Sequence, residues 1–388
     1  MSQSWTDHRS DRIAFLEQSQ IRAMTRECER VDGINLGQGV CPLPSPPQLL
    51  EAAAAAIRDD CSTYSRFDGI ASLRRGIANK LKQHNGLDVD PDGEIVTTVG
   101  SAGAFTCTIQ GLFNPGDEII VFEPFYGYHL NAIRASGCKP RVVTLPRPDW
   151  KLQKGALEAL KSERTKAVLI NTPANPSGKV FDETELEQIA DFCRRHDLLA
   201  ITDEIYEYMV YDGHRHISIA TLEGMWDRTV TISGFSKTFA ITGWRLGYAA
   251  APAHLAEPIG LVNDLYYICA PTPLQHGLAK ALESLEDSYY EELCEKYRRN
   301  RDFFCQALSD GGLEPCVPQG AYYILADVSS LGAKDSRAAA MQLLEQTGVA
   351  SVPGEAFFAS DVGDDLVRFC VAQSWEVLQE AADRIRGL

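Results

Sequence analysis

The sequence predicts an α/β protein with a mostly parallel sheet flanked by helices, together with a smaller α+β unit. From about residue 95, short apolar runs rich in β-branched residues alternate with helical stretches. Such runs are typical of strands buried on both faces, and their alternation with helices indicates a parallel sheet. After residue 320 the order changes to closely spaced strands and helices. The 388 residues, 45% hydrophobic, provide enough chain for two or three units.

The elements follow in order. Apolar residues at helical spacing predict a helix over 14–30, and the prolines of 41–47 predict an extended linker into an alanine-rich helix. The spacing then predicts strands at 94–100, 117–124, 140–146, 166–173, 198–204 and 229–234, with helices at 102–113 and 184–196. A long charged helical stretch over 277–310 precedes strands at 321–329, 349–354 and 366–372 and helices near 338–346 and at the end of the chain. We expect a large domain over 45–280 and a small domain made of 1–44, which includes an N-terminal arm, and 281–388.

Composition excludes several classes of protein. The net charge of −16 argues against a nucleic-acid binder, which needs a basic face. We expect no membrane span, because no apolar run approaches ~20 residues, and the polar N-terminus has no signal-peptide core. Eleven cysteines without a CxxC pair predict free thiols in the cytoplasm. The histidines form no metal-binding motif, so we expect no metal site, and GHRH (213–216) predicts a solvated turn.

Chemically distinctive residues come directly after the predicted strands. In an open parallel sheet, ligands bind outside the carboxyl ends of the strands. Asp203 ends an apolar strand, where an unpartnered carboxylate is costly to bury. Lys237 lies among small residues, eight positions before Arg245. The other residues expected at this edge are the Gly100–Gly103 turn, which opens a helix and suits an anion, and Tyr126, Asn175 and Tyr206.

An amine, a carboxylate, a phenol and an anion-binding turn match a cofactor with an aldehyde, a ring nitrogen and a phosphate. Pyridoxal phosphate has these groups: its aldehyde reacts with a lysine, and its ring nitrogen pairs with a carboxylate. Desolvation and the positive charge of Arg245 would lower the pKa of Lys237, as a nucleophilic amine requires.

The motifs SKTFAITGWRLGY (236–248) and NPSG (175–178) before DEIY (203–206) resemble those of the fold-type I pyridoxal-phosphate enzymes, specifically the class I/II aminotransferases. The resemblance runs from LGQG (36–39) to VRFCVA (367–372). It implies a mostly parallel seven-stranded sheet, a pyridoxal 5'-phosphate-binding domain over 45–280, and a homodimer with shared sites.

The resemblance also implies roles at the cofactor ring. Lys237 matches the Schiff-base lysine, which also moves the 1,3-proton, and Asp203 matches the partner of the ring nitrogen. Tyr206 and Asn175 match the groups that hydrogen-bond the ring oxygen. Tyr126 matches the aromatic residue that stacks on the ring.

At the phosphate, Ser101 and Ala102 match the helix-opening turn, and Arg245 matches the phosphate arginine. Tyr64 matches a tyrosine that reaches the phosphate from the neighbouring subunit. Many relatives carry a serine where this chain has Gly234. Which of the flanking hydroxyls replaces it, Ser233 or Ser236, therefore stays open.

For the substrate carboxylate, Arg368 matches the family's arginine, and arginine suits bidentate carboxylate binding. Gly39 matches a glycine whose backbone approaches the same carboxylate, and Asn175 also belongs to this group. VCPL (40–43) and YYICAPTP (266–273) depart from the family pattern, so substrate specificity is open. Tyr322 and Tyr323 suggest an aromatic or apolar pocket.

The leading functional hypothesis is an aminotransferase that moves an amino group from an L-amino acid to a 2-oxo acid by ping-pong chemistry. A β-lyase or synthase is the alternative, because the same scaffold can expel a β-substituent. A non-catalytic effector-binding module is a third possibility, but it would need a basic DNA-binding domain that the acidic chain does not suggest.

Overall fold

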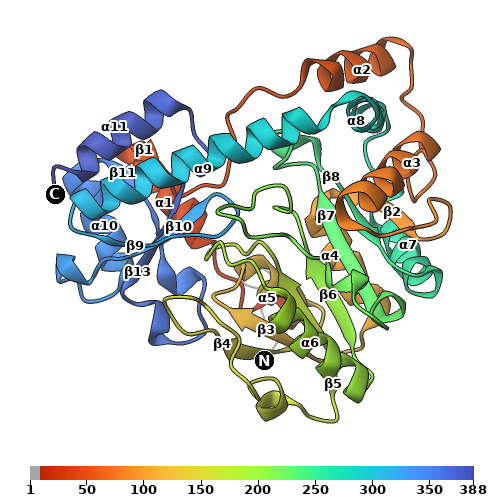
Figure 1. Cartoon of the computed structure of the whole chain (residues 1–388), viewed down its shortest axis with the longest axis horizontal. Helices are drawn as coiled ribbons and strands as arrows, with labels where there is room; N and C mark the ends of the chain where they lie inside the picture. The colour runs from red at the N-terminus through yellow and green to blue at the C-terminus, as the bar shows by residue number, and fades with distance from the viewer. Residues whose placement is uncertain (1–8) are drawn as a thin grey trace, which may run out of the picture.

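A seven-stranded mixed sheet forms the centre of the large unit in the computed structural model, which describes residues 9–388 (Figure 1). Residues 1–8 of the expected N-terminal arm lie outside the described residues. The strand order is β2-β8-β7-β6-β5-β3-β4, with β8 antiparallel to both of its neighbours and the other pairs parallel. The predicted mostly parallel sheet is thereby confirmed. The strands are β2 (Ile95–Val99), β3 (Glu118–Glu123), β4 (Lys139–Thr144), β5 (Thr165–Asn171), β6 (Leu199–Asp203), β7 (Thr229–Gly234) and β8 (Leu246–Ala250).

Helices cover both faces of this sheet because successive strand residues point to opposite sides. On β3, Ile119 and Val121 face a cluster that includes α4 (Gly100–Leu112), α5 (Gly127–Ala135) and α7 (Ala253–Tyr267). Ile120 and Phe122 face the opposite cluster, which includes α6 (Glu183–His196). Further along that second face, the residues of β2 and β8 pack with α2 (Pro47–Arg58), α3 (Ala71–Lys80) and α8 (Thr272–Ser284).

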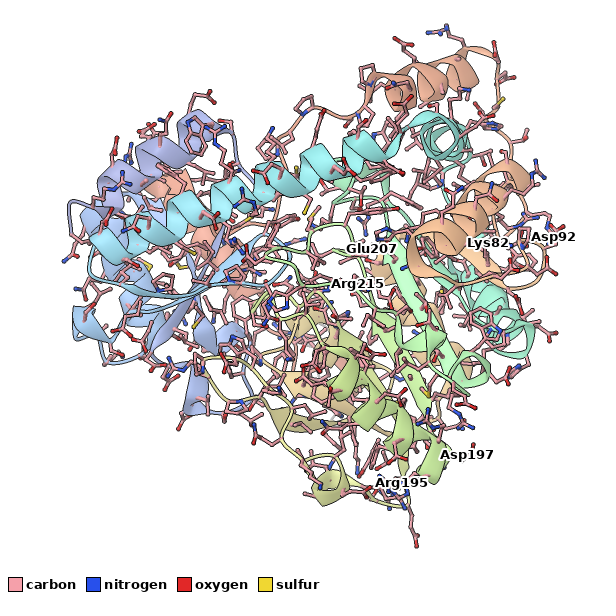
Figure 2. The ribbon with its side chains drawn as sticks, viewed as in Figure 1. Lys82, Asp92, Arg195, Asp197, Glu207 and Arg215 are labelled. Carbon is pink, nitrogen blue, oxygen red and sulfur yellow. The ribbon has the colours of Figure 1, made fainter. Side chains whose placement is uncertain are left out.

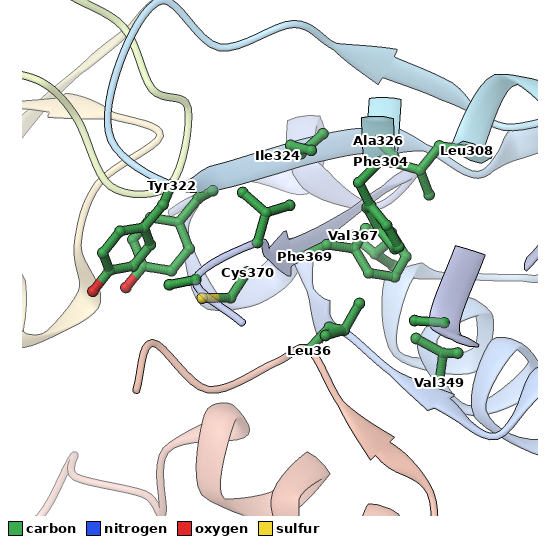
Figure 3. Packing of buried hydrophobic residues seen from close by; sticks show 14 of the residues in the cluster. Leu36, Phe304, Leu308, Tyr322, Ile324, Ala326, Val349, Val367, Phe369 and Cys370 are labelled. Atoms are coloured by element: carbon green, nitrogen blue, oxygen red, sulfur yellow. The ribbon is translucent and has the colours of Figure 1, made fainter. Parts of the chain in front are cut away.

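The smaller unit contains an antiparallel sheet of order β12-β13-β10-β9 and a parallel pair, β1 with β11. Its core is shown in Figure 3, where Phe304 and Leu308 of the long helix α9 pack beside Phe369 of β13. Its elements are α1 (Gln20–Arg30), β1 (Ile34–Asn35), α9 (Asp287–Asp310), β9 (Glu314–Cys316), β10 (Tyr323–Asp327), α10 (Ser336–Thr347), β11 (Val349–Ala350), β12 (Val352–Pro353), β13 (Leu366–Cys370) and α11 (Trp375–Ile385).

Two of the expected helices are different in the structure. The predicted helix over 14–30 begins only at Gln20, so Phe15 precedes it. The stretch 277–310 contains parts of two helices, α8 and α9, which are separated at 285–286. Extended backbone at Leu285 and Glu286 makes this break, which the apolar spacing did not reveal.

Both small sheets lie outside residues 45–280 and the large sheet lies within them, although the domain boundaries themselves remain a prediction. None of the helices in residues 9–388 combines the length and the apolar character needed to cross a bilayer.

Candidate active site

One edge of the large sheet brings together the chain segments that carry the predicted site. The parallel strands β3, β5, β6 and β7 end there, and β2, which is parallel to them across β8, ends there too. The antiparallel strand β8 begins at the same edge, so Arg245 lies beside the start of α4. A cavity of about 220 Å³ opens here. It is lined by Ile21, Arg22, Gln38, Gly39, Ser101, Tyr126, Tyr128, Asn171, Asn175, Asp203, Ile205, Tyr206, Lys237, Tyr323 and Arg368.

Lys237 extends into this cavity from the turn that follows β7. Its Nζ donates a hydrogen bond to the carbonyl oxygen of Gly39 at 3.0 Å, and within residues 9–388 it has no carboxylate in salt-bridge range. Burial is the main cause that lowers the pKa of Lys237 to about 8, and the guanidinium groups of Arg368 and Arg245 act in the same direction. The unprotonated fraction of this amine near neutral pH is therefore far larger than that of an ordinary lysine, whose pKa is 10.5.

Asp203, at the end of β6, is buried. Its carboxylate contacts the imidazole of His129 rather than a lysine or an arginine. Its Oδ2 lies 2.9 Å from Nε2 of His129, and its Oδ1 accepts a hydrogen bond from the Ile205 amide at 3.2 Å. His129, on α5, packs edge-on against the ring of Tyr126 with 5.2 Å between ring centroids. These contacts fix the carboxylate in one orientation at the cavity wall.

Tyr206 and Tyr323 form a hydrogen-bonded pair of phenols deep in the site. The hydroxyl of Tyr206 donates to that of Tyr323 at 3.1 Å. Burial raises the pKa of Tyr206 well above its ordinary value, so it remains a neutral donor. The Tyr323 hydroxyl lies against Gly39, where any Cβ would clash with it. A side chain at position 39 would therefore displace the Tyr323 hydroxyl.

Arg368 brings the small unit into the site from β13. Its Nη1 donates to Oδ1 of Asn175 at 2.9 Å and its Nη2 donates to the carbonyl oxygen of Gly37 at 2.6 Å. Its Nε is buried and has no hydrogen-bond partner among the residues that the structure describes. The ring of Tyr323 lies 4.2 Å from the guanidinium carbon. A guanidinium that lines a cavity and has no carboxylate partner within residues 9–388 is suited to bind an oxygen anion.

The start of α4 and Arg245 form an anion-binding corner next to the cavity. Gly100 has a positive φ of 72°, and a Cβ there would meet the Arg245 guanidinium. The Arg245 side chain is exposed, donates to the Thr242 carbonyl oxygen at 3.0 Å, and forms no ion pair within residues 9–388. The free amides of the helix start and this cation can bind an anion together.

Five predicted site residues do not line the cavity: Tyr64, Ala102, Ser233, Ser236 and Arg245. Ala102 and Arg245 belong to the corner just described. Tyr64 is 81% exposed and lies away from the cavity of its own chain. Ser236 follows β7 directly before Lys237 and is buried.

The structure contradicts the suggestion that Ser233 faces the phosphate. Its hydroxyl is wholly buried and donates to Oε1 of Glu207 at 2.9 Å. The expected solvated turn at 213–216 is also wrong for His216. Its side chain is only 5% exposed and its Nε2 lies 2.9 Å from Oε2 of Glu204. In both places tertiary contacts with buried glutamates override the local pattern.

Several cavity residues were not found from the sequence. Asn171 ends β5, so the rule that identified Asp203 could have found it; its Oδ1 accepts from the Asn175 amide at 2.8 Å. His129, which contacts Asp203 without lining the cavity, lies inside a helix and carries no local signal. Ile21, Arg22 and Tyr128 come from α1 and α5, which reach the cavity only through tertiary packing.

An enclosed lysine, a buried carboxylate and a helix start beside an arginine thus lie together at one edge of this sheet. A sequence model described as "Aminotransferase class I and II" matches residues 31–385. The chain belongs to this family.

Individual relatives agree over nearly the whole length. The chain is 36% identical over 380 residues to aromatic-amino-acid aminotransferase 2 of Thermococcus litoralis, covering 97% of each chain. It is 38% identical over 385 residues to kynurenine–oxoglutarate transaminase 3 of Mus musculus, covering 91% of this chain and 84% of the relative. The structure of N-succinyldiaminopimelate aminotransferase from Mycobacterium tuberculosis superposes with a TM-score of 0.95 at 34% identity, covering 98% of this chain and all of that one (100%). The protein is therefore a transaminase, which favours the leading hypothesis over the lyase and the effector-binding module.

Proposed function

We propose that this transaminase uses pyridoxal 5'-phosphate, held by Lys237, to move an amino group from an L-amino acid to a 2-oxo acid by ping-pong kinetics. The observation that carries the proposal is the Lys237 amine, which is enclosed, has no carboxylate partner among residues 9–388, and has its pKa lowered to about 8. An amine of this kind is a competent nucleophile and base at physiological pH.

The surrounding residues fit this cofactor. The Asp203 carboxylate is only 5% exposed and has no Lys or Arg partner within the described chain, so a protonated ring nitrogen would supply the missing counter-charge. The unpaired Arg245 and the glycine-lined start of α4 fit a phosphate. When bound, the cofactor supplies an electron sink for the bond pair released at the substrate Cα.

The roles of the chain's own side chains follow from their positions. Lys237 would hold the cofactor aldehyde carbon until the substrate amine replaces its Nζ there. The freed Nζ would then take the substrate Cα proton and return it to the cofactor side. Tyr206 and Asn175 would donate to the ring oxygen, and Tyr126 would stack on the ring. The phosphate would be held by Ser101, Ala102, Ser236 and Arg245.

We infer that the substrate carboxylate binds at Arg368, beside Asn175 and Gly39. Arg368 lines the cavity and supplies the guanidinium charge that a carboxylate requires. A second cavity of about 820 Å³ shares Ile21, Arg22, Tyr126 and Tyr128 with the first, and its other lining residues include Phe125 and Phe357. Space and aromatic walls of this kind favour a large aromatic or apolar amino acid, and one relative is named an aromatic-amino-acid aminotransferase.

We propose that the active form is a homodimer in which Tyr64 reaches the phosphate of the second subunit. Tyr64 is 81% exposed, and Leu261 and Leu265 of α7 are 64% and 75% exposed. Phe67, on the Tyr64 segment, packs at Gly260 of α7, so these apolar groups share one surface. Such a surface on a monomer would favour association. A cytoplasmic place in amino-acid metabolism, and no nucleic-acid partner, complete the proposal; eleven free cysteines and the charge of −16 are consistent with it.

The test is a single-turnover absorbance experiment. Purified protein loaded with pyridoxal 5'-phosphate is mixed with single amino acids, without an oxo-acid acceptor. We expect loss of the cofactor's visible band and one equivalent of oxo acid without ammonia, fastest for aromatic amino acids. Accumulation of ammonia while the band persists would indicate elimination and contradict the proposal. An equally fast response to aspartate would contradict the substrate class alone.

A further inference from the structure

Behind the cavity lies a buried charged network that the proposed reaction does not use. The segment Asp203–Glu207 is a tight turn, in which the Glu207 amide donates to the Glu204 carbonyl oxygen at 3.0 Å. Asp203 and Tyr206 line the cavity, whereas Glu204 and Glu207 do not. Glu204 and Glu207 are 0% and 4% exposed. Figure 2 shows Glu207 in the interior of the molecule, whereas Asp92 and Asp197 lie at its periphery.

Both carboxylates are held by groups from other elements. Glu207 pairs with Lys80, the last residue of α3, and its Oε1 accepts from Ser233 of β7. Asn85, in the π-helical turn Leu81–Asn85, donates to Glu207 at 2.8 Å and to Glu204 at 3.4 Å. Its Oδ1 accepts from Lys80 at 2.9 Å. The network therefore ties the turn to α3 and to the neighbouring strand.

Glu204 completes the arrangement. Its Oε1 accepts from Thr202 at 3.0 Å, and its Oε2 lies 2.9 Å from Nε2 of His216. Glu204, Glu207 and His216 lie close enough to bind a metal ion, with one ligand atom each within 4.8 Å of the others. The Lys80 ammonium already provides the cation at Glu207, so the arrangement is that of a charge-balanced anchor and we assign it no metal.

We propose that Glu204 and Glu207 are positioning residues for the transamination site: by anchoring the far face of the turn, they set the positions of Asp203 and Tyr206 at the cavity. This inference rests on the proposed function, because it concerns the two groups assigned to the cofactor ring. The physical basis of the proposal is that each glutamate is bonded through the backbone to a residue of the cavity. Glu204 directly follows Asp203, and Glu207 directly follows Tyr206, so a shift of either anchor moves a ring-binding side chain. Site geometry must be kept to within about 0.5 Å to remain productive.

The chain offers a matched control for a purely structural role. Lys179 and Glu185 form another fully buried lysine–glutamate pair, 2.8 Å apart and 3% and 2% exposed. Glu185 caps α6 and accepts from the Leu152 amide at 2.8 Å, and it makes no hydrogen bond to the Asp203–Glu207 turn. Glu185→Gln therefore removes a buried carboxylate of the same kind at a different place.

The experiment compares Glu204→Gln, Glu207→Gln and Glu185→Gln in the full-length protein. Three quantities are measured: the dissociation constant of the apo-protein for pyridoxal 5'-phosphate, the pH midpoint of the visible band of the bound cofactor, and the urea midpoint. We expect Glu204→Gln and Glu207→Gln to weaken cofactor binding roughly tenfold and to move the pH midpoint by about half a unit, because Asp203 and Tyr206 are displaced. Glu185→Gln should lower the urea midpoint and leave the other two quantities unchanged.

The inference is overturned if both turn variants keep the wild-type dissociation constant and pH midpoint, whatever their stability. If they do not fold, Asn85→Ala decides by the same readouts, because Asn85 bridges the two carboxylates: a shift supports the inference and an unchanged pair of values overturns it. Failure of the proposed function is a separate result, since wild-type protein would then bind no pyridoxal 5'-phosphate and develop no visible band.

Discussion

Two enclosed lysines on opposite faces of the Asp203–Glu207 turn differ in how their charge is balanced. Lys80 pairs with Glu207 and donates to Asn85 at 2.9 Å and to the Tyr248 hydroxyl at 3.2 Å. Within the described part of the chain Lys237 donates only to the Gly39 carbonyl oxygen, at 3.0 Å, and burial lowers its pKa to about 8. The fold satisfies the charge of Lys80 and leaves that of Lys237 uncompensated. A lysine without a partner is costly for stability and suited to chemistry.

Removing the reactive amine should produce the largest effect. Lys237→Ala is expected to lower the rate of single-turnover transamination by at least about 10³-fold, because nothing else in the cavity can both hold the cofactor and carry the proton. The measurement is the absorbance assay described above. Lys166→Ala, which removes an exposed lysine of β5, should react like the wild type. A Lys237→Ala variant within tenfold of the wild type would refute the role of this lysine.

Breaking the compensated Lys80–Glu207 pair should produce the largest loss of stability. Lys80→Met leaves the Glu207 carboxylate buried without its cation and should cost about 3–5 kcal/mol of unfolding free energy. Replacing both residues, Lys80→Met with Glu207→Met, should recover much of this loss, because no charge is then left buried. Urea denaturation measures both variants. A single variant as stable as the wild type would mean that the pair is not a structural anchor.

Removing the charge of Lys237 should raise the stability of the apo-protein, by an amount that depends on pH. Because the folded-state pKa of Lys237 is lowered from 10.5 to about 8, protonation is penalised in the folded apo-protein. The penalty is fully present below pH 8 and disappears as the pH rises towards 10.5, so stability from this group rises across that window. Lys237→Met should therefore stabilise the apo-protein at pH 7 by at most about 3 kcal/mol, and by progressively less at higher pH. Urea midpoints of the two apo-proteins from pH 7 to 10 test this, and a constant difference would contradict it.

The smallest expected effects concern Ser233 and Ser236, on either side of Gly234. Removing one hydroxyl should affect cofactor affinity, and removing the other should affect stability. Ser236→Ala should weaken pyridoxal 5'-phosphate binding severalfold by removing one phosphate donor, at a cost of about 1 kcal/mol. Ser233→Ala should lower the unfolding free energy by a similar amount, since Glu207 loses a hydrogen bond. Titration of the apo-proteins with cofactor, combined with urea denaturation, compares them. Stronger loss of cofactor affinity in Ser233→Ala than in Ser236→Ala would reverse this assignment.

The sequence predicted the features that depend on the order of strands. Asp203, Asn175 and Lys237 follow strands of a parallel sheet, so their meeting at one edge required only the fold class. Arg245 precedes β8, which runs antiparallel to β7 and therefore begins at the edge where β7 ends. A residue before β8 thus lies at the same edge as the residues after the parallel strands. The family motifs supplied Arg368, which comes from a separate sheet.

The remaining features depend on which way a side chain faces. Ser233 lies one residue from Gly234, yet its hydroxyl points to Glu207, because successive strand residues alternate between faces. His129 reaches Asp203 from the first turn of α5, and His216 reaches Glu204 from a loop with a polar sequence. Neither contact has a local signature, since each depends on the packing of segments far apart in the chain.

The most direct test of the central claim is to identify the lysine that carries the cofactor. The wild-type protein is loaded with pyridoxal 5'-phosphate, reduced with borohydride, digested and examined by peptide mass spectrometry. We expect one cofactor per chain, on the peptide that contains Lys237. Attachment at Lys80, at Lys179 or at an exposed lysine, with Lys237 unmodified, would contradict the conclusion that the uncompensated lysine is the reactive one.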